Sequence, residues 1–198
     1  MVTPRWHTPG VSAPLDLPPG VARAFDVSRR AGYVSFCRNE TGRLLAALAA
    51  TRTGTMAEFG TGCGVGTAWL RSGVRGDAHI LTAELDPRLA EAAAEIFVDD
   101  PQVDVRTADQ STLRAEGPFS LLFLDYGEPG EVTVEAIADL VEPGGIVVLD
   151  DVVPCEQWPP MAGGRVDVVR ERWLLDERFT AAEVMLAPDA AALVATRR

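Results

Sequence analysis

The fold is decided by residues 55–66, which read TMAEFGTGCGVG. The apolar run at 55–59 is typical of a buried strand, and apolar residues at helical spacing follow over 65–72. Glycines between a strand and a helix let the backbone come close to a ligand and permit positive φ angles. The helix N-terminus behind such a turn favours negative charge, which suits the carboxylate of a cofactor. The segment therefore predicts a ligand-binding turn between a strand and a helix.

The alternation of strands and helices continues on both sides of this turn. Further strands are predicted at 78–84, 103–107, 119–125 and 146–150, and two last strands at 180–186 and 191–196 flank a turn at 187–189. Helices are predicted at 21–32, 39–51, 88–97, 131–141 and 167–177, with a turn at Glu142-Pro143-Gly144-Gly145. Apolar strands separated by helices indicate a parallel sheet covered on both faces.

We therefore expect an α/β fold with one domain at residues 21–198. Its doubly wound, mostly parallel seven-stranded sheet would carry helices on both faces and a C-terminal antiparallel hairpin. Residues 1–20 are rich in proline and are expected to form an extended N-terminal segment.

The spacing of the glycines separates two kinds of nucleotide cofactor. A dinucleotide fingerprint needs GxGxxG, but here the third glycine position falls on Val65, Thr67 or Trp69. Glu84 ends the next predicted strand, where an acid can accept hydrogen bonds from both hydroxyls of a ribose. The pattern is thus an acid followed by GxGxG, with a ribose-binding acid one strand later.

With these residues the chain resembles the class I S-adenosylmethionine-dependent methyltransferases. The matching motifs are Glu58-x-Gly60-x-Gly62-x-Gly64, then Glu84, then Ala108-Asp109-Gln110 after the third strand. In that family an acid at the position of Asp109 usually contacts the adenine amino group. The resemblance covers about residues 35–198, and it implies S-adenosylmethionine as cofactor. The cofactor-binding residues that it implies are Glu58, Gly60, Thr61, Gly62, Gly64, Gly66, Thr67, Glu84, Leu85, Asp109, Gln110 and Asp125.

Three aspartates end neighbouring predicted strands. Asp125 ends one strand, and Asp150 and Asp151 end the next, so their carboxylates should converge. Such a set of oxygen donors suits Mg²⁺ or Ca²⁺. Position alone equally allows one aspartate to cap a helix and another to face solvent.

A further resemblance favours a metal site over a capping or solvent-facing role for these aspartates. The arrangement is similar to the catechol and caffeoyl-CoA O-methyltransferase group, in which aspartates at these places hold a divalent metal. It implies Mg²⁺, or another divalent cation, at Asp125, Asp150 and Asp151. Residues 40–45 also resemble the helix start that packs near the cofactor in that group. The implied reaction is O-methylation of a small hydroxylated acceptor.

One departure concerns the base for the hydroxyl proton. The group places a lysine after the first metal aspartate, but all 18 basic residues of this chain are arginine. Either the metal alone acidifies the acceptor hydroxyl, or another group takes the proton, with Glu128 and His7 as candidates. The alternatives left open are a methyltransferase acting on nitrogen or on a macromolecule without metal, a non-catalytic cofactor-binding module, and an oxidoreductase.

Composition limits the partners and the location. The formal net charge of −11 disfavours binding to nucleic acid. The cysteines Cys37, Cys63 and Cys155 lack the spacing of a disulfide framework or a zinc site, and no apolar run reaches the roughly 18 residues that a membrane span needs. We expect a cytoplasmic protein with a small-molecule acceptor. Members of the group are often dimers, so a homodimer is an open alternative to a monomer.

Overall fold

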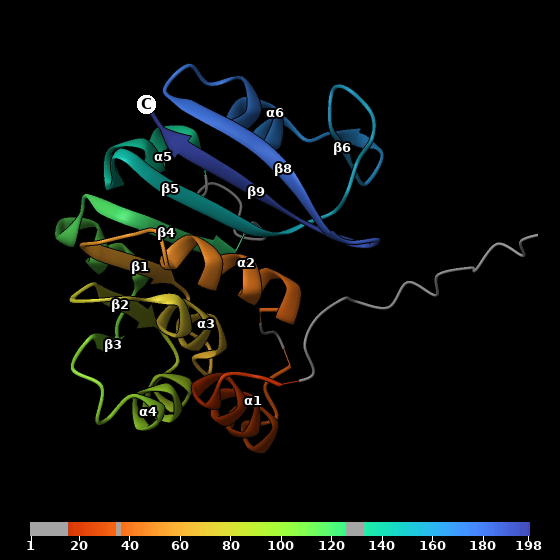
Figure 1. Ribbon diagram of the computed structural model, residues 1–198. Coiled ribbons are helices and arrows are strands. Elements are labelled where there is room, and N and C mark those ends of the chain that lie inside the picture. Colours follow the sequence, from red (N-terminus) through yellow and green to blue (C-terminus); the bar gives the residue numbers. More distant parts are fainter. Residues whose placement is uncertain (1–15, 35–36, 126–132) are drawn as a thin grey trace, which may run out of the picture.

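A seven-stranded sheet forms the centre of the protein (Figure 1). The computed structural model describes residues 16–34, 37–125 and 133–198, and of Asp125 it describes only the backbone. The strand order is β3-β2-β1-β4-β5-β9-β8. The strands are β1 (Thr55–Phe59), β2 (His79–Glu84), β3 (Val103–Thr107), β4 (Phe119–Asp125), β5 (Val141–Val152), β8 (Phe179–Ala187) and β9 (Ala190–Arg197).

Strand directions confirm the predicted fold class. Strands β1 to β5 are mutually parallel, whereas β9 runs antiparallel to β5 and β8 antiparallel to β9. The carboxyl ends of β1, β2, β4 and β5 therefore meet at one edge of the sheet. The chain order reverses between β1 and β4, and open α/β sheets bind ligands at this kind of position.

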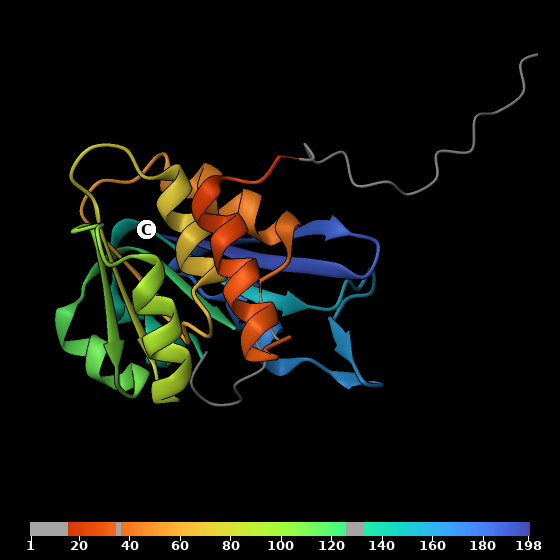
Figure 2. The same ribbon diagram turned by 90° about the horizontal axis from the view of Figure 1, so that it is seen from below.

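Helices cover both faces of the sheet. On one face α2 (Asn39–Ala49) and α3 (Val65–Gly73) pack on the central strands. Figure 2 shows α1 (Pro19–Ala31) lying beside α3 and α4 (Pro87–Ile96), and buried apolar residues of these three helices form one cluster. The other face carries α5 (Val134–Ile137), α6 (Val168–Leu175) and the 3-10 helices η1 (Gln110–Glu116) and η2 (Ala138–Leu140).

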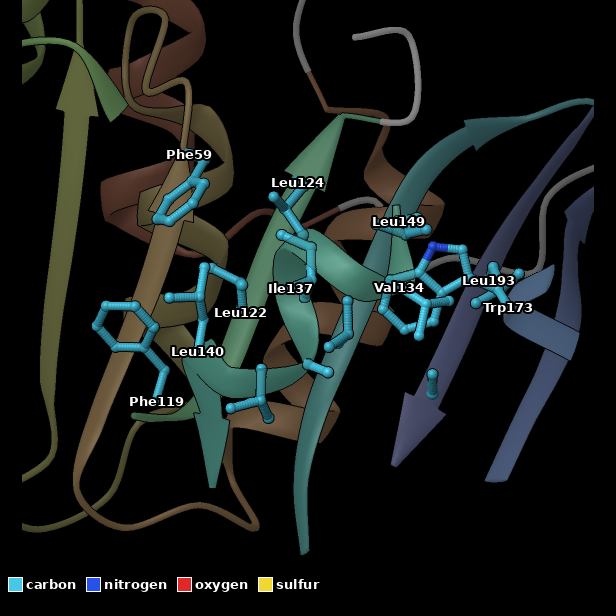
Figure 3. Packing of buried hydrophobic residues seen from close by; sticks show 14 of the residues in the cluster. Phe59, Phe119, Leu122, Leu124, Val134, Ile137, Leu140, Leu149, Trp173 and Leu193 are labelled. Atoms are coloured by element: carbon cyan, nitrogen blue, oxygen red, sulfur yellow. The ribbon is translucent and has the colours of Figure 1, made fainter. Parts of the chain in front are cut away.

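The core on this second face contains several fully buried aromatic and aliphatic side chains. Figure 3 shows Ile137 of α5 among side chains of β4 and β5. Trp173 of α6 meets Phe179 at the start of β8 edge to face, with ring centroids 5.0 Å apart. Burying such a side chain stabilises the fold by about 2–3 kcal/mol, so this cluster fixes α5 and α6 against the sheet.

The prediction of one helix over 131–141 is wrong for the residues that the structure describes. Residues 131–132 lie outside the described part; beyond them α5 covers only Val134–Ile137, η2 follows, and β5 begins at Val141. Val141 pairs with Phe119 and Ile146 with Leu121, so the expected turn at 142–145 is an irregularity inside β5. Strand pairing here overrides the helical spacing of the sequence.

Some further elements were not predicted. Strands β6 (Met161–Ala162) and β7 (Arg165–Val166) form a small hairpin whose turn residues, Gly163 and Gly164, both have positive φ. Helix α1 begins at Pro19, two residues inside the segment expected to be extended. None of the helices in the described residues is both long and apolar enough to cross a bilayer.

Candidate functional site

The glycines that follow β1 face different surroundings. Gly60 has a φ of +90°, and a Cβ built there would meet no atom within 4 Å. At Gly62, with a φ of +52°, a Cβ would lie 2.7 Å from the ring of Tyr33. At Gly64, the N-cap of α3, a Cβ would lie 3.1 Å from the ring of Phe97. Of these three glycines, Gly60 alone borders open space, and it marks where a ligand can approach the backbone.

Glu58 is enclosed beneath the turn. The hydroxyls of Thr67 and Thr82 both donate to its Oε2, the latter at 3.2 Å. A Cβ at Gly66 would lie only 2.0 Å from its Oε1, so a side chain at that position would exclude the carboxyl group. Burial raises the pKa of Glu58 to about 8, although the two hydroxyls oppose this shift. The residue joins β1, β2 and α3 at the base of the turn.

Glu84 holds the same turn from β2. Its Oε2 accepts the backbone N–H of Gly62 at 2.8 Å, and its Oε1 accepts the N–H of Asp86 at 2.9 Å. Each carboxylate oxygen has a second lone pair, so Glu84 can still accept hydroxyl groups of a ligand. Leu85 beside it is exposed. Nearby, the hydroxyls of Thr61 and Thr82 lie 2.6 Å apart, which fixes the turn to β2.

Asp109 and Gln110 lie at the same edge of the sheet. Asp109 caps η1 by accepting the N–H of Ser111 at 2.8 Å, and this contact lowers the pKa of Asp109. The N–H of Ala108 donates to the backbone oxygen of Glu84 at 3.0 Å. The predicted adenine-binding segment is thus attached next to the predicted ribose-binding acid.

A cavity of about 80 Å³ is lined by residues of the glycine turn and by the two aspartates at the end of β5. It contains five of the predicted cofactor-binding residues and two of the three predicted metal ligands. Its lining residues among those described are Tyr33, Cys37, Glu58, Phe59, Gly60, Thr61, Gly62, Cys63, Val65, Gly66, Phe123, Asp150 and Asp151. Glu84, Leu85, Asp109 and Gln110 lie outside this lining, along the adjoining edge.

Asp150 and Asp151 contribute carboxylates to the cavity from the end of β5. Asp150 is 7% exposed, and its Oδ1 accepts the hydroxyl of Thr41 at 2.9 Å. Asp151 is exposed and has a φ of +58°, a left-handed conformation that aspartate tolerates better than most residues. The backbone of Asp125 pairs in register with Asp150. The described side chains include no group of three histidine, cysteine, aspartate or glutamate residues placed to hold a metal ion, and the side chain of Asp125 is not among them.

The start of α2 is fixed close to this cavity. A Cβ at Gly42 would lie 2.2 Å from the indole of Trp69 on α3, so the two helices cross in direct contact. The guanidinium of Arg43 lies over the same indole, 5.3 Å from its centroid. This packing holds Thr41 against Asp150 at the edge of the cavity.

The described residues that line the cavity include acidic side chains and no basic one. Arg38 is close by, but it forms a paired contact with Asp189 in the turn between β8 and β9, at 3.0 and 3.1 Å. Asp189, and more weakly Asp151, raise the pKa of Arg38. Burial, and then the charge of Asp150, raise the pKa of the Cys37 thiol. The arrangement favours a ligand that carries positive charge.

Sequence reasoning did not predict six of the lining residues, and two of these, Tyr33 and Cys37, lie outside the strands and the turn that carry the motifs. These two lie in the connection between α1 and α2, about 25 residues before the glycine turn, and no motif marks them. Glu128 and His7, the predicted candidates for the proton acceptor, lie outside the described residues.

Comparison with known proteins connects this geometry to a family. A family model described as a methyltransferase domain matches residues 57–152. A relative from Mycobacterium ulcerans (strain Agy99), named as an O-methyltransferase, is 30% identical over 77% of this chain and 75% of its own length. The chain belongs to the O-methyltransferase family. A second relative of this family, from Mycobacterium sp. (strain JLS), is 32% identical over 54% of this chain, and the match spans about half of that relative, 53%.

Solved structures of methyltransferases share the fold. A methyltransferase from Geobacter sulfurreducens superimposes with a TM-score of 0.76 at 17% identity, over 94% of this chain and 93% of its own. The O-methyltransferase from Bacillus cereus, solved in complex with SAH, gives a TM-score of 0.74 at 19% identity, over 92% and 93%. The family match at 57–152 includes the glycine turn, Asp150 and Asp151, whereas Tyr33 and Thr41 precede it.

Proposed function

We propose that this member of the O-methyltransferase family transfers the methyl group of S-adenosylmethionine to a hydroxyl oxygen of a small acceptor, with a divalent cation at Asp150 and Asp151. The observation that carries the proposal is that both aspartates line the same cavity as Glu58 and Gly60. The proposed cofactor turn and the proposed pair of metal ligands therefore border one small space.

The cofactor half of the proposal rests on the turn. S-adenosylmethionine carries a sulfonium cation, which the carboxylates around the cavity would attract. Gly60 leaves open space for it, and Glu84 retains lone pairs for ribose hydroxyls at the adjoining edge. SAH in the related Bacillus cereus enzyme is consistent with this role for the shared fold.

The donor set fits a hard divalent cation such as Mg²⁺. Asp150 and Asp151 supply carboxylate oxygens, Thr41 orients Asp150, and the backbone of Asp125 lies in register beside them. A cation bound there would lower the pKa of an acceptor hydroxyl that it contacts.

The chain itself has to align the reactants. Methyl transfer is an in-line displacement at the sulfonium carbon, in which the acceptor oxygen forms the new C–O bond as the C–S bond breaks. The glycine turn would hold the cofactor while the end of β5 orients the acceptor, and both are fixed to the same rigid sheet. Because the sequence contains no lysine, Glu128 and His7 are the candidates for receiving the hydroxyl proton.

Calorimetry and a transfer assay test the proposal. We expect S-adenosylmethionine to bind, and phenolic acceptors to be methylated in the presence of Mg²⁺. Removal of metal by EDTA should abolish transfer, added Mg²⁺ should restore it, and Asp150→Asn should lower kcat/KM at least about 100-fold. Asp176→Asn, at the opposite edge of the sheet, is the matched control and should keep full activity.

Three results would contradict parts of this proposal. If the parent protein kept full activity in EDTA and the Asp150→Ala variant were also fully active, a metal requirement would be excluded. Methylation of amines or macromolecules but not of hydroxyl groups would assign another acceptor. A chain that binds S-adenosylmethionine but methylates no acceptor would be a non-catalytic cofactor-binding module, and one that binds a nicotinamide cofactor instead would be an oxidoreductase.

A further inference from the structure

Tyr33 lies directly on the glycine turn. Helix α1 ends at Ala31 and is capped by Gly32, whose φ of +67° reverses the chain, and the N–H of Tyr33 donates to the backbone oxygen of Ser28 at 2.9 Å. This C-terminal cap directs Tyr33 towards the sheet. The ring then lies so close to Gly62 that a Cβ at Gly62 would be within 2.7 to 3.0 Å of three atoms of the tyrosine side chain.

The position of the ring is held by the packing of α1. Val21 and Ala24 of α1 are fully buried in one cluster with Val65 and Trp69 of α3. Helix α3, which begins after the glycine turn, therefore packs against α1, which ends just before Tyr33. Tyr33 and the turn belong to one packed unit.

The surroundings of the ring favour a cation. Tyr33 lines the cavity together with the acidic side chains of Asp150 and Asp151, and the space beside Gly60 is open. The face of a tyrosine ring attracts cations, and the attraction grows when the site excludes water. A ligand seated at Gly60 would thus meet an aromatic wall within an acidic cavity.

We infer that Tyr33 is a cofactor-binding residue whose ring contacts the sulfonium cation of S-adenosylmethionine and thereby distinguishes it from the uncharged thioether of SAH. This inference rests on the proposed function. The consequence for the enzyme is a weaker hold on the product than on the substrate form of the cofactor, since loss of the methyl group removes the charge that the ring recognises.

The inference is tested by measuring how S-adenosylmethionine and SAH bind to variants in which the ring at position 33 carries increasing numbers of fluorine atoms. Phenylalanine, 4-fluorophenylalanine and 3,4,5-trifluorophenylalanine at position 33 keep the shape of the ring but progressively weaken its attraction for cations. We expect Tyr33→Phe to bind S-adenosylmethionine within about twofold of the parent protein. The trifluoro variant and Tyr33→Leu should each raise its Kd at least about fivefold, while the Kd of SAH changes less than about twofold.

The controls separate this inference from the proposed function. Phe25→Leu removes an aromatic ring from α1 that does not line the cavity, and it should leave both Kd values unchanged. Thermal unfolding identifies any variant that fails to fold, and the fluorinated series then carries the test. Equal losses for both cofactor forms, or no loss for either, would overturn the inference. A parent protein that binds neither form would instead overturn the proposed function.

Discussion

The hydroxyl of Thr41, in the first turn of α2, donates to Oδ1 of Asp150 at a distance of 2.9 Å, across 109 positions in the sequence. This bond connects the helix that packs on Trp69 with the strand end that carries the acidic pair. It fixes one oxygen of a carboxylate that is 7% exposed and that lines the cavity. The orientation of Asp150 is therefore set before any ligand binds.

Replacing Thr41 by valine should weaken the proposed binding of Mg²⁺ at Asp150 without destroying the fold. Valine has the same shape but no donor, so Asp150 loses its orienting bond. Removing such a supporting partner typically lowers metal affinity or activity by about 10–100-fold. Thr41→Ser keeps the hydroxyl and should stay close to the parent protein. The Mg²⁺ concentration giving half-maximal activity measures the effect; an identical value for both variants would show that Thr41 is not needed.

A methyl group at Gly66 should destabilise the turn. In Gly66→Ala the new Cβ would lie 2.0 Å from Oε1 of Glu58 and 2.9 Å from the ring of Phe123, and neither neighbour has room to move freely. Overpacking of this kind costs about 1–3 kcal/mol in the free energy of unfolding. Gly20→Ala, in the first turn of α1, meets nothing within 4 Å and should be neutral. Urea denaturation compares the two, and equal stabilities would contradict the packing described around Glu58.

The buried Glu58 should make stability depend on pH. Its pKa is raised from 4.5 to about 8, so between these values the folded protein keeps a proton that the unfolded chain releases. Its contribution is fully present below pH 4.5 and is lost as the pH rises through about 8. Glu58→Gln cannot titrate. The stability of the variant relative to the parent should therefore increase from pH 5 to pH 8, with a limiting slope of about 1.4 kcal/mol per pH unit. Parallel pH curves in chemical denaturation would argue against a protonated Glu58.

Two arginines of α6 should differ strongly in their effect on stability. Arg170 is 1% exposed and pairs with Asp167 at 3.2 Å and with Glu183 at 3.1 Å. Arg170→Met would leave both carboxylates without this partner, and breaking a buried pair costs about 3–5 kcal/mol. Arg172 is 62% exposed and lies 3.6 Å from Glu135, so Arg172→Met should change stability by less than about 1 kcal/mol. The difference in denaturation midpoint checks the prediction, and similar midpoints would refute it.

Much of the sheet could be predicted because most of its strands can be recognised from the apolar residues within their own short segments. Residues 119–125 are a nearly continuous apolar run and residues 55–59 contain three apolar residues, and β4 and β1 occupy these ranges as predicted. The start of β5 at Val141 could not be predicted in this way, because it depends on pairing with Phe119 more than 20 positions earlier. Strands β6 and β7 have only two residues each, too few for a periodic pattern.

The same distinction applies to the site. The spacing of Gly60 and Glu84 pointed to the cofactor turn, since both sit at predicted strand ends. The contact between Tyr33 and Gly62 left no trace in the sequence, because it depends on how α1 packs over α3. Spacing also could not distinguish the glycines: one borders open space, whereas the others accommodate Tyr33, Phe97 and Glu58.

The irregularity inside β5 has a consequence for how the family can vary. Between the pairs Phe119–Val141 and Leu121–Ile146 the chain absorbs extra residues, and beyond it the register stays regular up to Asp125–Asp150. The extra residues lie at the opposite end of the strand from the acidic pair. Insertions or deletions at Pro143-Gly144-Gly145 can thus change the length of the connection without moving Asp150 relative to β4. The strand separates a segment tolerant of length changes from one in which a one-residue slip would turn Asp150 to the other face of the sheet.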